Sequence, residues 1–270
     1  MRKPFPFLAI AFVSLACASP PANVFMEGSR ERIPMPRKWE SGHFVLGQRE
    51  GGMEVIGVAT RHHARWGDEV LEQEIEAARD DAAQRVAMFL GMSGTVESFH
   101  RVGASFFDFV ADSRIELERD APDHTPFAER LTFDPARDVL VFERGMLVRF
   151  RYPASVPRVP SGRVSVGGRP EWVSGRDLPD VDGHILAVGF SQNQVWLRDT
   201  VARATEAAAA ALLRSMYTTI EVADVDMQGG AVSEIRSVSQ GRLESFAILE
   251  FWIDPATMSV YTLGIARAGI

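Results

Sequence analysis

Apolar positions recur at helical spacing in two long segments of the chain. In residues 68–90 they lie three or four positions apart: Leu71, Ile75, Ala78, Ala82, Val86 and Phe89. This stripe predicts an amphipathic helix with one buried face, which Asp68 can cap and Gly91 can end in a left-handed conformation. In residues 195–216 the stripe is Val201, Ala204, Ala208 and Leu212. The alanine run at 207–211 predicts that this second helix approaches a sheet closely.

Shorter apolar or alternating runs predict strands before and after each helix. They cover residues 55–59, 139–142 and 146–152 in the first half, and residues 185–189, 218–226, 245–253 and 260–267 in the second. Between the last two runs, Asp254-Pro255-Ala256-Thr257 predicts a type I turn, because proline fixes φ at the second position. These two strands therefore form a hairpin, and at least part of the sheet is antiparallel.

The two halves of the chain repeat this order of elements. An offset of 130 residues aligns the first strand of each half and places Trp66 on Trp196. An offset of 120 then places Asp134-Pro135-Ala136 on Asp254-Pro255-Ala256. The sequence therefore predicts an α+β fold with two tandem copies of a β-α-β-β-β module, each with one helix packed on a mostly antiparallel sheet. The modules span residues 36–153 and 170–270, with a proline- and glycine-containing linker at 154–169.

The first 17 residues have the layout of a lipoprotein signal peptide. Arg2 and Lys3 precede an apolar run at residues 5–16 that is too short to span a membrane. Cys17, the single cysteine, follows Ser-Leu-Ala, a run that resembles the bacterial lipobox except that leucine is usual where Ser14 stands. Lipidation at Cys17 predicts a palmitate-type anchor, and Ala18 after it favours the outer membrane by analogy with enterobacterial sorting. Several acyl chains anchor a protein stably, since each buried methylene contributes about 0.8 kcal/mol.

An alternative cleavage site keeps a second location open. Ala16-Cys17-Ala18 also fits a small-x-small site, whose use would release a soluble periplasmic protein. On either interpretation, the proline-containing polar residues 18–35 form a tether.

Net charge narrows the range of partners. The chain has a formal charge of -7, and removal of the signal peptide leaves 27 basic against 36 acidic residues. This excess of acid argues against a general affinity for nucleic acid.

The second half also resembles a known family. The carrying segments are Pro170-Glu171-Trp172, residues 185–190, the alanine-rich helix, residues 249–255 and residues 260–267. In this order they are similar to the family typified by the twenty-kilodalton membrane-associated lipoprotein of Helicobacter, whose relatives include flagellar outer-membrane and assembly proteins. The resemblance covers about 100 residues and implies a non-enzymatic envelope lipoprotein without catalytic residues. The first half departs from it through an insertion at 112–131 and through Arg149 and Arg151.

Candidate catalytic and ligand-binding residues are sparse. His62 and His63, near Asp68 and Glu69, fit an exposed loop better than a metal site, which needs three or four converging ligands. Met92-Ser93-Gly94 follows a helix, whereas a nucleophile elbow precedes one. The glycines of the linker, Gly162, Gly167 and Gly168, do not follow a strand as a phosphate loop must.

Two further sets of residues are expected to be structural. An acidic helix side, formed by Glu72, Glu74, Glu76, Asp80 and Asp81, is expected to be solvated rather than catalytic. The five tryptophans, Trp39, Trp66, Trp172, Trp196 and Trp252, are expected in the cores, with an aromatic ligand groove as the alternative.

The sequence thus favours an envelope protein that is not an enzyme and carries no cofactor or metal. Its expected partners are the outer membrane, other envelope proteins and, through sheet edges, a second copy of itself. The first alternative is a periplasmic ligand-binding lipoprotein with its site between the two modules, and the second is a hydrolase with an unrecognised site.

Overall fold

The computed structural model describes most of the chain after residue 42. The described residues are 43–46, 48–49, 52–61, 72–103, 112–120, 123–142, 145–156, 169–176, 178–227 and 230–268. The predicted signal peptide with Cys17, the tether and most of the predicted linker lie outside these ranges, as do His62, His63 and Asp68. Within these ranges no helix is both long and apolar enough to cross a membrane.

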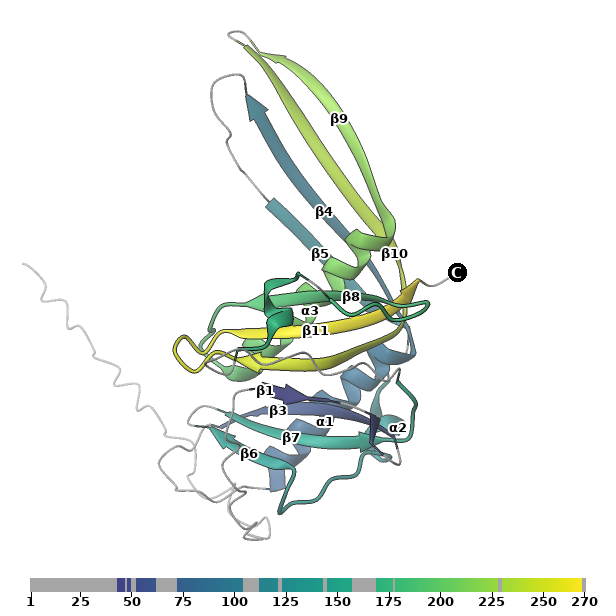
Figure 1. Ribbon diagram of the computed structural model, residues 1–270, viewed down its shortest axis with the longest axis vertical. Coiled ribbons are helices and arrows are strands. Elements are labelled where there is room, and N and C mark those ends of the chain that lie inside the picture. Colours follow the sequence, from purple (N-terminus) through teal and green to yellow (C-terminus); the bar gives the residue numbers. More distant parts are fainter. Residues whose placement is uncertain are drawn as a thin grey trace, which may run out of the picture. The chain divides into compact units, whose positions relative to one another are not determined.

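A four-stranded antiparallel sheet belongs entirely to the first half of the chain (Figure 1). Its order is β2-β3-β7-β6, with bounds β2 Gln48–Arg49, β3 Gly52–Thr60, β6 Val139–Phe142 and β7 Gly145–Tyr152. Helix α1 (Glu72–Leu90) packs on this sheet through its buried residues, which include Ile75, Ala78, Ala82 and Val86. These are stripe positions, so the expected buried face of the helix is confirmed.

A seven-stranded antiparallel sheet draws strands from both halves. Its main path is β5-β4-β10-β11-β8, while β1 and β9 also pair with β10. The bounds are β1 His43–Val45, β4 Met92–Gly103, β5 Asp112–Arg119, β8 Ile185–Ser191, β9 Thr218–Met227, β10 Gly230–Ile253 and β11 Val260–Ala268. The insertion of the first half contributes β5 and a short helix α2 (Thr125–Ala128). A 3-10 helix, η2 (Glu171–Ser174), precedes β8.

Strand β10 organises this larger sheet because it is 24 residues long and changes neighbours along its length. Residues 230–243 of β10 pair with β9 or β4, or with both, whereas its residues 243–253 pair with β11 and, in part, with β1. Register irregularities near Glu244 and Ile248, and a positive φ of 55° at Ser245, mark the change. The sequence predicted only residues 245–253 of this strand.

Helix α3 (Leu197–Tyr217) lies against β8, β10 and β11, and its alanines make the close approach that the sequence predicted. Gly189 is required at this crossing, because a Cβ there would lie 2.0 Å from the carbonyl oxygen of Ala204. Gly57 has the corresponding role in β3, where a Cβ would lie 1.8 Å from the carbonyl oxygen of Ala78.

The buried core is continuous across the two halves. One cluster joins Ile56 and Val58 of β3 to Val201 of α3 and to Phe251 of β10. The α+β class and the antiparallel sheets are therefore confirmed. Two tandem modules as separate bodies are not shown, because β4 and β5 from the first half pair into the sheet of the second half.

The predicted left-handed end of α1 at Gly91 is wrong. The described glycines with positive φ are Gly52, Gly175 and Gly183. Gly91 instead leads directly into β4, and its carbonyl accepts a hydrogen bond from Asp120 N at 3.0 Å. Its lack of a side chain matters because a Cβ would lie 2.2 Å from the Asp120 carboxylate.

The predicted turn at Asp254 is confirmed as the connection of a hairpin between β10 and β11. Ala256 N donates to Asp254 Oδ1 at 2.9 Å, and the Thr257 hydroxyl donates to Oδ2 at 2.8 Å. These two hydrogen bonds hold the pKa of Asp254 below its usual value.

Candidate functional site

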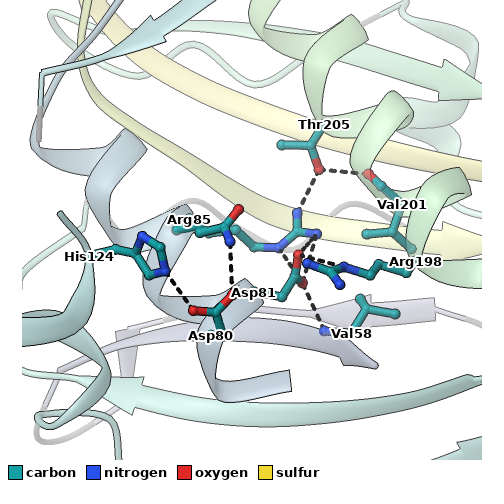
Figure 2. Close-up of polar contacts among 9 residues, drawn as sticks. Val58, Asp80, Asp81, Arg85, His124, Arg198, Val201 and Thr205 are labelled. Carbon is teal, nitrogen blue, oxygen red and sulfur yellow. Dashed lines mark hydrogen bonds and ion pairs between the residues drawn. The ribbon is translucent and has the colours of Figure 1, made fainter. Parts of the chain in front are cut away.

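A buried polar junction connects α1 of the first half to α3 of the second. We call it the junction and define it by Val58, Asp81, Arg85, Arg198, Val201 and Thr205 (Figure 2). Asp81 lies at its centre and is 6% exposed. One carboxylate oxygen of Asp81 accepts hydrogen bonds from Val58 N at 2.8 Å and from Arg85 Nε at 3.2 Å. The carboxylate thus caps a backbone donor of β3 and neutralises a guanidinium one helical turn away.

The guanidinium of Arg85, in α1, connects the junction to α3 through a hydrogen bond. Its Nη1 donates to the Thr205 hydroxyl at 2.8 Å, and that hydroxyl donates to the Val201 carbonyl, also at 2.8 Å. Arg198 Nε lies 3.9 Å from Asp81 Oδ1 and adds a second positive charge. Because the charges are paired and hydrogen-bonded, this arrangement can hold two helices in register.

The neighbouring carboxylate has a different environment. Asp80 is half exposed, and its Oδ1 forms a hydrogen bond of 2.6 Å with His124 Nε2 (Figure 2). Gln84 Nε2 donates to the other oxygen of Asp80 at 2.9 Å. Adjacent acids on one helix therefore face a buried junction and a solvated contact, respectively.

The expectation of a solvated acidic helix side is accordingly wrong for two of its five members. Glu74 is buried with Arg61, whose Nε lies 3.3 Å from the Glu74 carboxylate, and Asp81 is buried in the junction. Glu72, Glu76 and Asp80 are exposed, as expected. The missed signal was spacing: residues 74, 81 and 85 follow one line along the helix beside the apolar stripe.

Two further buried carboxylates have polar partners in the described structure. Asp138, directly before β6, lies 2.8 Å from Arg149 Nη2 and 3.4 Å from Arg151 Nη2. The arginines that set the first half apart from the family resemblance thus neutralise a buried aspartate across the β6–β7 hairpin. Such pairing fits a structural role.

The second of these carboxylates, Glu250 in β10, accepts a hydrogen bond from Trp172 Nε1 at 2.6 Å and contacts His43 Nε2 at 2.7 Å. These partners come from distant parts of the chain, so no local pattern could have predicted the cluster. Trp172 and Trp252 are buried in one core cluster, as expected for core packing, and Trp196 precedes α3. Trp39 and Trp66 lie outside the described residues.

A small cavity lies between β3 and β10, which belong to different halves. Its volume is about 30 Å³, and its lining includes Met53, Phe89, Val201, Phe246 and Arg85. Sites for small organic ligands are typically 300–1,000 Å³, about ten times larger or more. This cavity has no tryptophan in its lining, and it gives the alternative of a ligand site between modules no support.

The described residues do not bring the candidate metal-binding or hydrolytic side chains into a suitable arrangement. Within those ranges no group of three or more His, Cys, Asp or Glu side chains is placed to hold a metal ion. His62 and His63 lie outside them, as do Gly162, Gly167 and Gly168. Ser93 lies in β4 after α1, so it is not at a strand-to-helix turn.

Unpaired strand edges are the second candidate feature. Among the described residues β1, β5, β8 and β9 of the larger sheet each pair with a neighbour on one side only, as β2 and β6 do in the smaller sheet. Seven large apolar side chains of the described structure are notably exposed, and five of them lie on those four strands of the larger sheet: Val45, Ile115, Ile185, Phe190 and Ile220. Apolar exposure is therefore concentrated where another strand could be added.

Strands β4, β5 and β9 with residues 230–243 of β10 form what we call the arm. Its near end is covered by α3, where Met92 and Val96 are buried against Leu212 and Leu213. The β4–β10 pairing continues to Gly103, roughly 23 Å beyond Val96 at about 3.3 Å per residue. In Figure 1 the strands of the arm run on past the end of α3.

Comparisons with known proteins give no relative: no family model, curated protein or solved structure matches the chain. The resemblance to the Helicobacter lipoprotein family remains a prediction from the residues that carry it.

Proposed function

We propose that this chain is a non-enzymatic bacterial envelope lipoprotein that acts in assembly through protein–protein contacts at its strand edges. In this proposal Cys17 carries the lipid, residues 18–35 form the tether, and the folded part lies at the periplasmic face of the outer membrane. The signal-like start of the sequence supports the location. The pairing of the buried carboxylates Asp81, Asp138 and Glu250 supports a structural role for the polar clusters.

The observation that carries this proposal is the placement of exposed apolar side chains on end strands. An unpaired strand edge offers a row of backbone donors and acceptors to an incoming strand, and apolar side chains add packing to those hydrogen bonds. Ile220, at 65% exposure on β9, is the most exposed of the five apolar side chains on end strands.

The composition of β9 indicates the chemistry of its partner. The strand reads Thr-Thr-Ile-Glu-Val-Ala-Asp-Val-Asp-Met, with three acids and no cation. Like charges that face one another across a strand pair are destabilising, so a second copy of β9 is a poor partner. A strand that carries Lys or Arg on a different envelope protein fits this edge better.

We also propose that the two halves descend from one duplicated module, with the residue alignment corrected by the contacts. Gly57 and Gly189 both lie under a helix carbonyl, which aligns the first strands at an offset of 132 instead of 130. The Asp134 carboxylate accepts a hydrogen bond from Ala136 N at 3.0 Å, as Asp254 does from Ala256 N. Strands β3, β7 and β6 pair in the same order as β8, β11 and β10.

Photo-crosslinking in the native host tests the contact function. A photoreactive phenylalanine analogue at position 220 is expected to capture a different envelope protein, because this side chain lies at the proposed edge. The same analogue at Val195, which is 68% exposed but precedes α3, is the matched control and is expected to capture none. Equal capture at both positions, or none at position 220 while the purified protein retains a small molecule, would contradict the proposal.

The anchor is tested separately with Cys17→Ala. This change should abolish labelling by a palmitate analogue and release the protein from the membrane fraction. A wild-type mature chain that begins at Ser19 without lipid would refute the anchor and support the soluble alternative.

A further inference from the structure

Strand β5 is an end strand of the arm, and it carries both acidic and basic residues, whereas β9 carries only acids. It pairs with β4 on one side, and no described strand pairs with its other edge. Leu117 packs in the cluster that includes Leu213 of α3, so Leu117 and Ile115 belong to the face that α3 covers. Because side chains alternate along a strand, Arg114 and Glu116 belong to the opposite face. Both are well exposed, at 72% and 62% of their side-chain surfaces.

On that opposite face the charges alternate in sign toward the edge. Arg236 of β10 lies 2.8 Å from the Glu97 carboxylate of β4, and Glu97 is the register partner of Arg114 in β5. Arg114 contacts Glu116 of its own strand. The row therefore ends at the edge of the sheet with one positive and one negative side chain, both accessible.

We propose that β5 pairs antiparallel with β5 of a second copy, across a two-fold axis that passes through Ile115. In this register Arg114 of each copy lies opposite Glu116 of the other, and the two Ile115 side chains meet on the α3 face. The alternation of charge then continues across the interface, and two exposed isoleucines become buried. This inference rests on the proposed function, in which strand edges make the contacts, and it names a second copy as the partner for one edge.

Charge favours this register over the two adjacent ones. A two-fold axis perpendicular to the sheet requires a central residue that faces itself. Centring on Arg114 places arginine on arginine, and centring on Glu116 places glutamate on glutamate, both unfavourable. Centring on Ile115 gives two opposite-charge pairs beside an apolar contact. In the same register Asp112 lies opposite Glu118 at the outer ends, so the favourable pairs are confined to the centre.

Charge reversal tests this pairing with variants that control for one another. In a homodimer of the Arg114→Glu variant, two glutamates lie opposite each other at each 114–116 pair. In a homodimer of the Glu116→Arg variant, two arginines do. Each variant alone should therefore dimerise at least about tenfold more weakly than wild type. Mixed together they restore both opposite-charge pairs, so the mixture should form a heterodimer with wild-type strength. Association is measured by sedimentation on full-length chains with Cys17→Ala, which removes the lipid site and the single cysteine.

The sedimentation outcomes either support or overturn the proposal. A wild-type chain that stays monomeric overturns it, as does a reversal variant that dimerises as strongly as wild type. A mixture that associates no better than its components also overturns it. Restoration in the mixture shows at the same time that both variants fold.

A single engineered cysteine tests the register. In the Cys17→Ala background, Ile115→Cys should form an intermolecular disulfide under mild oxidation, because residues directly opposite in an antiparallel pair have Cα atoms about 4.5–5.5 Å apart. Ile220→Cys on β9 is the matched exposed control and should stay largely monomeric. Failure at position 115, or equal cross-linking at both positions, overturns the inference. Loss of the dimer with retained capture at Ile220 removes this inference alone, whereas a dimer without any envelope partner removes the proposed function.

Discussion

Replacement of Asp81 by alanine is the sharpest test of the junction. The change removes the acceptor of the Val58 backbone N–H and the main counter-charge of Arg85, which is itself only 12% exposed. Val58 is fully buried and Arg85 nearly so, so bulk solvent does not simply replace the lost carboxylate. The side chain lies between two helices and a strand, so its loss affects the contact between both halves of the chain.

The expected cost follows from these contacts. Breaking a buried ion pair by removal of one partner typically costs about 3–5 kcal/mol, because the remaining charge is left uncompensated. The Val58 N–H left without its acceptor belongs to the same penalty, at about 1–3 kcal/mol on its own. Arg198, 3.9 Å from the carboxylate, is more exposed and adds little. We therefore expect Asp81→Ala to lower the free energy of unfolding by about 3–5 kcal/mol.

Urea unfolding followed by circular dichroism measures this cost, and a double-mutant cycle separates the pair from its surroundings. Arg85→Met alone should also destabilise the protein, but Asp81→Ala with Arg85→Met should cost at least about 1.5 kcal/mol less than the sum of the single changes, because no lone charge remains. Asp80→Ala is the matched control: this exposed neighbour should cost less than about 1 kcal/mol. A cost below about 1 kcal/mol for Asp81→Ala, or strict additivity in the cycle, would refute the junction as a stabilising unit.

Three further predictions follow from the packing, the hairpin turn and the shared sheet. Gly189→Ala should destabilise the chain by about 1–3 kcal/mol or more, because the new methyl group would lie 2.0 Å from a helix carbonyl; Gly264→Ala, with its nearest neighbour a side-chain atom at 3.1 Å, should cost clearly less in the same thermal unfolding assay. Asp254 has a lowered pKa, so its contribution to the free energy of unfolding is present above the unfolded pKa of about 3.9 and is lost as pH falls through the folded value. Asp254→Ala should therefore lower the free energy of unfolding by about 0.5 kcal/mol at pH 7, and this difference should shrink in acid. A pH-independent difference would contradict the hydrogen-bonded carboxylate. A chain that ends at residue 156 should show no cooperative unfolding transition, since its β4 lacks the β10 partner; a sharp two-state transition would show an independent first module.

Local features of the fold could be predicted from the sequence, and their physical basis explains why. The stripes of α1 and α3 depend on periodicity within one element, and the Asp254 turn depends on four consecutive residues. Strand β6 was predicted with its bounds, because its apolar run is continuous and ends at charged residues. Gly91 was misread because a glycine after a helix has two uses, and close approach to Asp120 won over a left-handed turn.

Strand pairing between distant segments could not be predicted in this way. The partners of β10 come from residues 43–45, 92–103, 218–227 and 260–268, and nothing in an alternating pattern specifies which strand lies beside another. The polar clusters share this property: Glu250 and His43 are separated by 207 positions in the sequence. Sequence reasoning therefore predicted the elements and some buried faces, but not the residues that join the halves.

The junction and the arm are connected through α1, and this connection bears on function. Asp81 and Arg85 hold α1 against α3, and α1 ends at Leu90, two residues before β4 begins. The junction therefore fixes the point at which β4 enters the larger sheet, and β5 takes its position from β4. A protein whose end strands bind partners needs those edges held in place, and buried charges that are paired and hydrogen-bonded can hold them. On this reasoning the junction serves to hold the arm in position, and weakening the junction should disturb contacts at Ile115 before it unfolds the core.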